Sequence, residues 1–388
     1  MSEPSQTVNT TFVDAAADVA TALATVDEPV VGIDVERADA DHYFRRAALV
    51  QIGVPGRCVL LDATTLEELD ALDRFLASDR TAVFHAMEND LAPLASKGVE
   101  PPQVADTAVA AAILGLPTGL ASLLSQLLDV ELDDDKGSYQ RADWEARPLT
   151  AGMAAYAAGD VVHLPHLWSQ LAERLEATGR RAWYDEDLAA VMAGAHEDQR
   201  DWTRVKGATS LPPEQRTVLR TVWEERERLA REHDIAPNRL LHDDVLRDLA
   251  TDPPRTEAQL VRRSPRRRSL LRQHAEDLLA AVQRGLGRDP ERSARARPPR
   301  RDDRDVYDAL RRRRAELAED LSLDPGVLAP ARPLWRAVTG DPADAAELCS
   351  LAGLNHWRSE LLATPLWQAY LAAREHEDHD LAEAPEVR

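Results

Sequence analysis

The sequence predicts a mixed α/β domain followed by domains built only of helices. Strand-like apolar alternation is confined to the first half of the chain, at 10–14, 29–36, 46–54, 57–61 and 81–85. Helix-like apolar spacing occurs between and after these strands, at 15–25, 66–76, 88–97, 105–114, 120–128 and 150–178. After residue 205 only helical spacing remains. This order indicates a mixed sheet with flanking helices, and then helical bundles.

Short turns join three of the predicted strands. Segments 29–36, 46–54 and 57–61 follow one another closely, and Pro55-Gly56 supplies the second turn, which predicts an antiparallel meander. The polar segment 133–148 is expected to be a loop. Thr150 is expected to cap the long helix that follows, with a bend at Pro165.

Breaker residues and composition divide the chain. We expect an α/β domain over 1–205, a helical domain over 207–288, a Pro- and Arg-rich linker over 289–303, a second helical domain over 304–375, and an acidic, disordered tail over 376–388. Segment 235–238 (Ile-Ala-Pro-Asn) matches segment 323–326 (Leu-Asp-Pro-Gly) in position, which indicates a duplicated helical module.

Composition excludes several classes of protein. No apolar run approaches the roughly 20 residues of a membrane helix, and no basic-then-apolar leader is present, so we expect a cytoplasmic protein without a membrane partner. Cys58 and Cys349 are far apart, which argues against a disulfide or zinc framework. The net charge of −21 argues against indiscriminate nucleic-acid binding. Arginine clusters between 255 and 314 could still form a phosphate-binding face, or simply solvated helix surfaces.

Four carboxylates and one tyrosine stand out by their spacing. Asp34 and Glu36 alternate on one face of a predicted strand, and Tyr156 and Asp160 lie four apart on one face of a predicted helix. Asp90 follows the strand 81–85 at a helix start. Each alone has an ordinary structural explanation. Together they give only oxygen ligands, which favour Mg²⁺ or Mn²⁺ over zinc. Four acids around two such cations is an arrangement used for phosphoryl transfer.

Further polar residues flank this set. His85 and Asn89 bracket the turn before Asp90, and we expect them to contact substrate. The segment 136–144 combines basic and aromatic side chains, which suits a phosphate and a base. From it we select Lys136, Gln140 and Arg141 as substrate-binding candidates; a plain surface loop is the alternative.

The motifs resemble those of a known nuclease superfamily. Gly-Ile-Asp-Val-Glu at 32–36, His-Ala-Met-Glu-Asn-Asp-Leu at 85–91 and Tyr-Ala-Ala-Gly-Asp at 156–160 look like the three exonuclease motifs of the DEDD superfamily, tyrosine subgroup. The segments 46–52, 106–107 and 141–150 extend the likeness. The later helices resemble helicase-and-RNase-D C-terminal (HRDC) domains. Residues 28–375 thus resemble the ribonuclease D family, in a form with two HRDC domains.

The resemblance implies an RNase-H-like fold and 3′→5′ hydrolysis of RNA with two divalent ions, Mg²⁺ or Mn²⁺. The products would be nucleoside 5′-monophosphates, and the substrates 3′ ends of RNA such as tRNA precursors. It implies that the four acids bind the ions and that Tyr156 orients the attacking water. Val35 stands where the family commonly has threonine.

Two other functions remain open at this point. A DNA 3′-5′ exonuclease would use the same acids, because metal and phosphate chemistry are shared between DNA and RNA. A non-catalytic nucleic-acid-binding protein would use the helical modules, although the complete acid set argues against it. The sequence does not reveal the oligomeric state.

Overall fold

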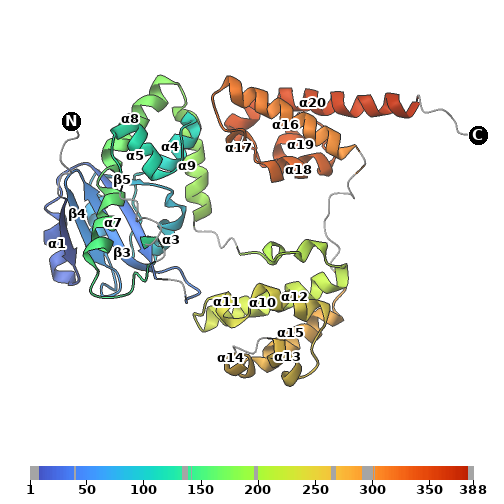
Figure 1. Cartoon of the computed structure of the whole chain (residues 1–388), viewed down its shortest axis with the longest axis horizontal. Helices are drawn as coiled ribbons and strands as arrows, with labels where there is room; N and C mark the ends of the chain where they lie inside the picture. The colour runs from blue at the N-terminus through green and yellow to red at the C-terminus, as the bar shows by residue number, and fades with distance from the viewer. Residues whose placement is uncertain are drawn as a thin grey trace, which may run out of the picture.

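The computed structural model describes residues 8–38, 41–132, 139–140, 142–195, 200–263, 268–290, 300 and 302–382. Figure 1 shows an α/β unit and two separate groups of helices. The fold class predicted from the sequence is confirmed. Within the described residues, every helix is too short or too polar to cross a bilayer.

The sheet has six strands in the order β1-β4-β3-β2-β5-β6. β2, β3 and β4 pair antiparallel, as the predicted meander requires, and β1, β5 and β6 add in parallel at the two edges. The strands are β1 (Asn9–Val13), β2 (Val30–Arg37), β3 (Ala47–Val54), β4 (Arg57–Asp62), β5 (Thr81–Phe84) and β6 (Val104–Asp106).

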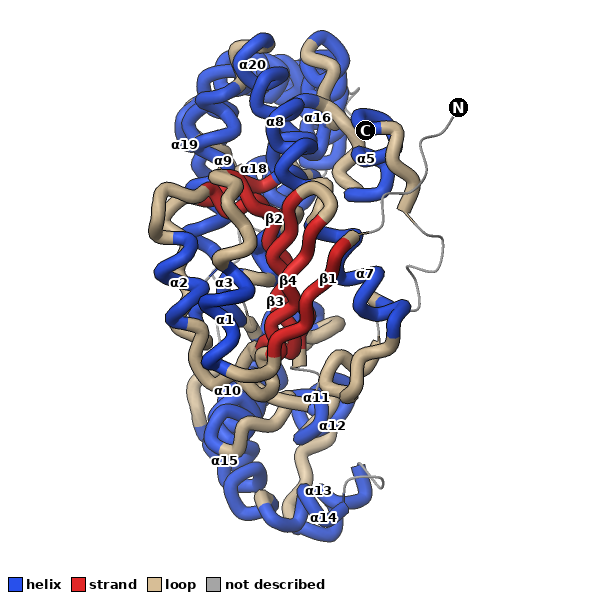
Figure 2. The backbone as a smooth tube through the Cα atoms, turned by 90° about the vertical axis from the view of Figure 1, so that its left-hand side faces the viewer, coloured by secondary structure: helices blue, strands red, loops and turns tan. Residues whose placement is uncertain are grey.

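Helices cover both faces of the sheet. One face packs on α1, α2 and α3, and the other on α4, α5, α7 and α8; Figure 2 shows the first three helices and α7 on opposite sides. The helices of this unit are α1 (Ala16–Leu23), α2 (Asp70–Leu76), η1 (Met87–Asn89), α3 (Leu91–Ala95), α4 (Thr107–Leu114), α5 (Leu120–Leu128), α7 (Ala151–Val161), α8 (Leu164–Ala177), α9 (Arg181–Ala195), η2 (Trp202–Arg204) and η3 (Ala208–Ser210).

Several predicted boundaries were wrong. The segment 105–114 begins as strand β6, because the Asp106 carboxylate caps α4 only from residue 107 onward. The predicted helix 88–97 is divided into η1 and α3, and that at 66–76 begins only at Asp70. The helix after Thr150 does not bend at Pro165 but ends at Val161; Pro165 lies in the first turn of α8, where proline needs no amide donor. The helix α9 was not predicted.

The two helical groups have the same plan. They comprise α10 (Pro213–Glu232), α11 (Pro237–Leu240), α12 (Asp243–Thr251), α13 (Glu257–Arg263), α14 (Arg268–Gln273) and α15 (Ala275–Gly287), then α16 (Asp303–Asp320), α17 (Pro325–Leu328), α18 (Ala331–Gly340), α19 (Ala345–Leu351) and α20 (His356–Ala382). The starts of α11, α12, α13 and α14 recur 88 residues later as the starts of α17, α18, α19 and α20 (237 to 325, 243 to 331, 257 to 345, 268 to 356). Because α20 reaches Ala382, the expected disordered tail is helical over 376–382.

Each helical group contains an equivalent internal hydrogen bond. The buried Arg226 donates from Nη1 to the Leu241 carbonyl at 3.1 Å, and Arg314 donates from Nη1 to the Ala329 carbonyl at 2.5 Å, each across 15 residues. An offset of 88 therefore relates specific contacts as well as helix ends. We call α10–α15 the first helical unit and α16–α20 the second helical unit.

The turn after the first helix of each unit contacts the α/β unit. This turn contains Asp234 in the first unit and Ser322 in the second, and both residues have positive φ (49° and 53°). The Leu321 carbonyl accepts a hydrogen bond from Arg180 at 2.6 Å. The Ser322 carbonyl lies so close to Gly115 (φ 72°) that a Cβ there would be 1.9 Å from it.

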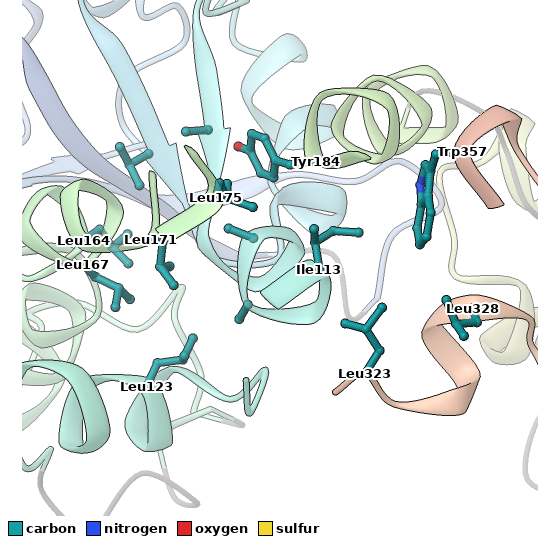
Figure 3. Close-up of a cluster of buried hydrophobic side chains, with 14 of the residues drawn as sticks. Ile113, Leu123, Leu164, Leu167, Leu171, Leu175, Tyr184, Leu323, Leu328 and Trp357 are labelled. Atoms are coloured by element: carbon teal, nitrogen blue, oxygen red, sulfur yellow. The ribbon is translucent and has the colours of Figure 1, made fainter. Parts of the chain in front are cut away.

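The second helical unit also packs on α9. Trp183 stacks on Trp357 with ring centroids 4.6 Å apart, and Asp187 accepts hydrogen bonds from Arg358 at 2.6 Å and Asn355 at 2.7 Å. Figure 3 shows Ile113 of α4 facing Leu323 and Leu328 across this contact. The contact is thus a continuous apolar core edged by charged hydrogen bonds.

The first helical unit holds residues 41–46, which lie between β2 and β3. The Asp234 carboxylate accepts from the Tyr43 and Phe44 backbone amides at 3.0 and 3.2 Å, and from His42 Nδ1 at 3.0 Å. Arg46 pairs with the same carboxylate. Hydrogen bonds from several donors lower the pKa of Asp234, although burial acts in the opposite direction.

Candidate active site

Strand β2 presents two acids on the face covered by α7. The backbone of Val161 in α7 lies directly over Gly32, where a Cβ would be 2.2 Å from its carbonyl oxygen. Side chains alternate along a strand, so Asp34 and Glu36 point to the same side as Gly32. Only glycine at 32 lets α7 approach this closely, and that approach brings α7 side chains to the acids.

Helix α7 supplies Tyr156 and Asp160. Carboxylate oxygens of Asp34, Glu36 and Asp160 all lie within 4.8 Å of one another. The Tyr156 hydroxyl is hydrogen-bonded to the Asp160 carboxylate, as the four-residue spacing on a helix allows. The predicted pair therefore meets the β2 acids at one place.

Two aromatic rings support Tyr156. Trp144 is buried, its indole N–H donates to the Tyr139 carbonyl at 3.1 Å, and its ring lies 6.0 Å from that of Tyr156. The Tyr139 ring lies 5.7 Å from Tyr156 on another side.

The segment that carries Trp144 is tied down by an ion pair. Arg147 donates to both carboxylate oxygens of Asp62 at 2.6 Å, and Asp62 is buried. Burial would raise the pKa of Asp62, but hydrogen bonds from Arg147 and Thr64 lower it below its usual value. Within the predicted loop, residues 142–148 are thus held beside the tyrosine.

Asp90 lies deeper than the other three acids. It follows a left-handed residue, Ala86 (φ 64°), and the turn is fixed by Asp106, whose carboxylate accepts from the amides of Ala86 and Met87 at 3.2 and 2.7 Å. Asp90 is 5% exposed and does not belong to the group of three oxygens within 4.8 Å. Its charge still interacts with Asp34 and Glu36.

Burial and mutual repulsion disfavour negative charge here. Burial, and then the charges of Asp34, Asp160 and Asp90, raise the pKa of Glu36 to about 9. Burial, and then Asp34 and Asp106, raise the pKa of Asp90 well above its usual value. The pKa of Tyr156 is also raised, by burial and by the charges of Asp160 and Glu36.

These features suit a divalent cation. The donors are carboxylate oxygens alone, which Mg²⁺ and Mn²⁺ prefer, and a positive ion would relieve the repulsion that raises the pKa of Glu36. The residues present therefore fit the ions that the sequence suggests.

A pocket of about 480 Å³ opens over the acids. His85 and Gln140, two of the predicted substrate contacts, line it. Asn89 is exposed on the η1 turn and is absent from the pocket lining, and Lys136 and Arg141 lie outside the described residues. His85 Nδ1 lies 2.9 Å from the hydroxyl of Thr107, and that hydroxyl donates to the Phe84 carbonyl at 3.0 Å.

Sequence reasoning assigned no role to three features of the site. Residues 119–122, at the start of α5, also line the pocket, and the apolar spacing of this segment gave no hint of this. Asp106 was seen only as part of a resemblance, although an aspartate before a helix is a recognisable cap. Gln51, an amide in an otherwise apolar strand, was the clearest unused signal.

Comparisons with known proteins place this fold among nucleases that remove nucleotides from 3′ ends. Residues 9–176 match a family model described as 3′-5′ exonuclease, and residues 215–282 match the HRDC domain. The chain is 32% identical over 278 residues to ribonuclease D of a Jannaschia species, covering 67% of this chain and 69% of that protein. Ribonuclease D of Nitrobacter hamburgensis is 29% identical, with 86% of this chain and 87% of that protein covered.

A solved structure agrees. The crystal structure of Escherichia coli RNase D, described as an exoribonuclease involved in structured RNA processing, superimposes with a TM-score of 0.77 and 25% identity, covering 94% of this chain and 99% of that one. The chain belongs to the ribonuclease D family, and it is a 3′-5′ exoribonuclease.

Proposed function

We propose that this exoribonuclease uses two divalent cations, Mg²⁺ or Mn²⁺, and releases nucleoside 5′-monophosphates. Asp34, Glu36, Asp90 and Asp160 would hold the ions. The observation that carries this proposal is the convergence of three carboxylates within 4.8 Å beside Tyr156, at the base of one pocket.

The ions, when bound, lower the pKa of water and stabilise charge on the leaving oxygen. The chain contributes positioning. Asp34 and Glu36 are fixed by the sheet, and Asp160 by the packing of α7 on Gly32. Because the pKa of Tyr156 is raised, its hydroxyl stays protonated at neutral pH and orients the attacking water by a hydrogen bond instead of removing its proton.

We propose that the substrates are structured RNA precursors such as 3′-extended tRNA, acted on in the cytoplasm. The E. coli relative is described as acting in structured RNA processing. Both cysteines, Cys58 and Cys349, are free and buried, which suits a reducing compartment. His85 and Gln140 would contact the RNA end, because they line the same pocket as the acids. Asn89, Lys136 and Arg141 remain predicted contacts.

We also propose that the second helical unit is a second HRDC-like domain, and that the domains divide at 1–205, 207–288 and 304–375. The 88-residue offset and the equivalent arginine bonds support the duplication.

The first helical unit is the better candidate for binding the body of the RNA. It carries a hollow of about 1110 Å³ lined in part by Arg255, Arg262 and Arg263. At the positions 88 residues further on, the second unit has Ala343, Ser350 and Leu351. Arginines beside a hollow suit a phosphate backbone, and the small or apolar residues of the second unit do not.

The test uses 5′-labelled 3′-extended tRNA and a matched single-stranded DNA, with Mg²⁺ or Mn²⁺. We expect stepwise shortening of the RNA and release of 5′-monophosphates. Asp34→Asn should lower the rate on the order of 10³-fold, whereas the exposed Asp18→Asn should not change it.

Each alternative has its own outcome in this assay. Equal rates on RNA and DNA would favour a DNA exonuclease. Binding without shortening by the wild-type protein would favour a non-catalytic role.

A further inference from the structure

Gln51 is a buried amide without a hydrogen-bond partner in the described structure. Every residue of β3 is buried, and the others are apolar or glycine. The Gln51 side chain is 0% exposed, and neither its Nε2 nor its Oε1 has a partner. Buried amides are nearly always hydrogen-bonded, because an unpaired one costs free energy. A methionine would fill this position without the free-energy cost of an unpaired amide. Packing alone therefore does not explain the glutamine.

The sheet register places Gln51 beside the candidate metal site. Gln51 pairs directly with Asp34, and two residues along, Gly53 pairs with Gly32. Val161 of α7 packs over both glycines. Alternation along each strand therefore points Gln51 and Asp34 to the α7 side, where directly paired Cβ atoms lie about 4.5–5.5 Å apart.

A neighbouring acid on the same face shows the contrast. Asp62, on the adjacent strand β4, is also buried, but its carboxylate accepts from Arg147 and Thr64. The fold thus satisfies one buried polar side chain completely and leaves another unsatisfied next to Asp34. Gln51 lies on the strand that pairs with the strand of Asp34, whereas Asp62 lies one strand further away.

We propose that Gln51 is a positioning residue for the divalent-ion site, whose side-chain N–H donates to the Asp34 carboxylate when Asp34 holds an ion. Carboxylates that bind metals are generally oriented by a second hydrogen bond of this kind. The inference rests on the proposed function, because it requires that Asp34 bind a divalent cation.

The experiment compares metal binding with stability in the full-length protein. Mn²⁺ is titrated by calorimetry into wild-type protein, Gln51→Met and a matched control, Leu60→Met. Leu60 of β4 is buried and is the register partner of Gln51 in β3. Its replacement therefore disturbs the same packing without removing an amide. Thermal unfolding is measured in parallel with a chelator present.

We expect Gln51→Met to weaken Mn²⁺ binding about tenfold or more. Its melting temperature without metal should equal or exceed that of the wild type, because an unpaired buried amide is gone. Leu60→Met should bind Mn²⁺ as the wild type does. If Gln51→Met does not fold, Gln51→Leu provides the same two readouts.

One result would overturn the inference: unchanged Mn²⁺ affinity in Gln51→Met would remove any role at the ion site. If the melting temperature were also lower, Gln51 would be assigned to packing alone. Failure of the wild-type protein to bind Mn²⁺ would instead reject the proposed two-metal function, so the two failures are distinguishable.

Discussion

At the residue scale, the pKa of Glu36 links pH, stability and metal binding. Burial and three neighbouring carboxylates raise it from 4.5 to about 9. The folded protein therefore holds this proton more tightly than the unfolded chain does, so the metal-free protein should lose stability as pH rises from 4.5 to about 9. A divalent ion competes with the same proton, so its affinity should rise over the same window.

Glu36→Gln isolates this effect. Without metal, the variant should match the wild type near about pH 5 and be the more stable of the two near about pH 8.5. Urea unfolding with a chelator at both pH values measures the difference. The same change in unfolding free energy between the two pH values in both proteins would contradict the raised pKa of Glu36.

The sequence predicts which residues form the candidate site better than it predicts how deeply each of them is buried. Strand period two pairs Asp34 with Glu36, and helix period four pairs Tyr156 with Asp160, because both relations are local. The burial of Asp90 depends on Asp106, 16 residues later, which fixes its turn, and no local period reports such a contact. The place of Gln51 opposite Asp34 is likewise set by strand register.

At the element scale, the site depends on how closely α7 approaches the sheet. A Cβ at Gly32 would lie 2.2 Å from the Val161 carbonyl, so Gly32→Ala must push α7 outward and carry Tyr156 and Asp160 with it. We expect a loss of about 1–3 kcal/mol in unfolding free energy. Because misplaced catalytic groups lose rate steeply, we also expect kcat to fall about 10²-fold with a smaller change in KM.

The control for Gly32→Ala is Gly194→Ala in α9. A Cβ at Gly194 meets nothing within 4 Å, so this change should leave kcat unaltered. Steady-state kinetics on a short single-stranded RNA and urea unfolding measure both variants. Wild-type kcat in Gly32→Ala would show that α7 has no need of this close packing.

Element boundaries were predictable only where a local signal marks them. The meander follows from short turns between apolar segments, and Thr150 caps α7 as its position before the helix suggests. The alanine-rich stretch after Val104 concealed β6, because alanine favours helix over strand and the pairing with β5 is a tertiary contact.

At the scale of the whole molecule, the two copies of the helical module contact the α/β unit at two different places. The turn after α10 holds the loop 41–46 through Asp234, and the equivalent turn after α16 lies against α4 and α9. The weak repeat in the sequence indicated the duplication. It could not indicate the attachments, since these depend on residues that differ between the copies, such as Asp234 and Ser322.

The same divergence predicts which helical unit captures RNA. Arg255 and Arg262 line a hollow of the first unit and have Ala343 and Ser350 as their counterparts in the second. Replacing both arginines with glutamine should weaken binding of 3′-extended tRNA and reduce its salt slope by about two, because each arginine would neutralise about one phosphate. Turnover of a short single-stranded RNA, which reaches only the catalytic pocket, should not change.

The matched control removes the same charge from the second unit. Arg332 and Arg336 are exposed on α18, and their joint replacement with glutamine should leave tRNA binding and its salt slope as in the wild type. Binding isotherms at several salt concentrations measure all three proteins. Equal losses in the two double variants would mean that net charge governs capture; a loss only in Arg332→Gln/Arg336→Gln would move the RNA to the second unit. A loss confined to Arg255→Gln/Arg262→Gln would place the RNA body on the unit that also holds residues 41–46, between β2 and β3, the two strands that pair beside the candidate metal site.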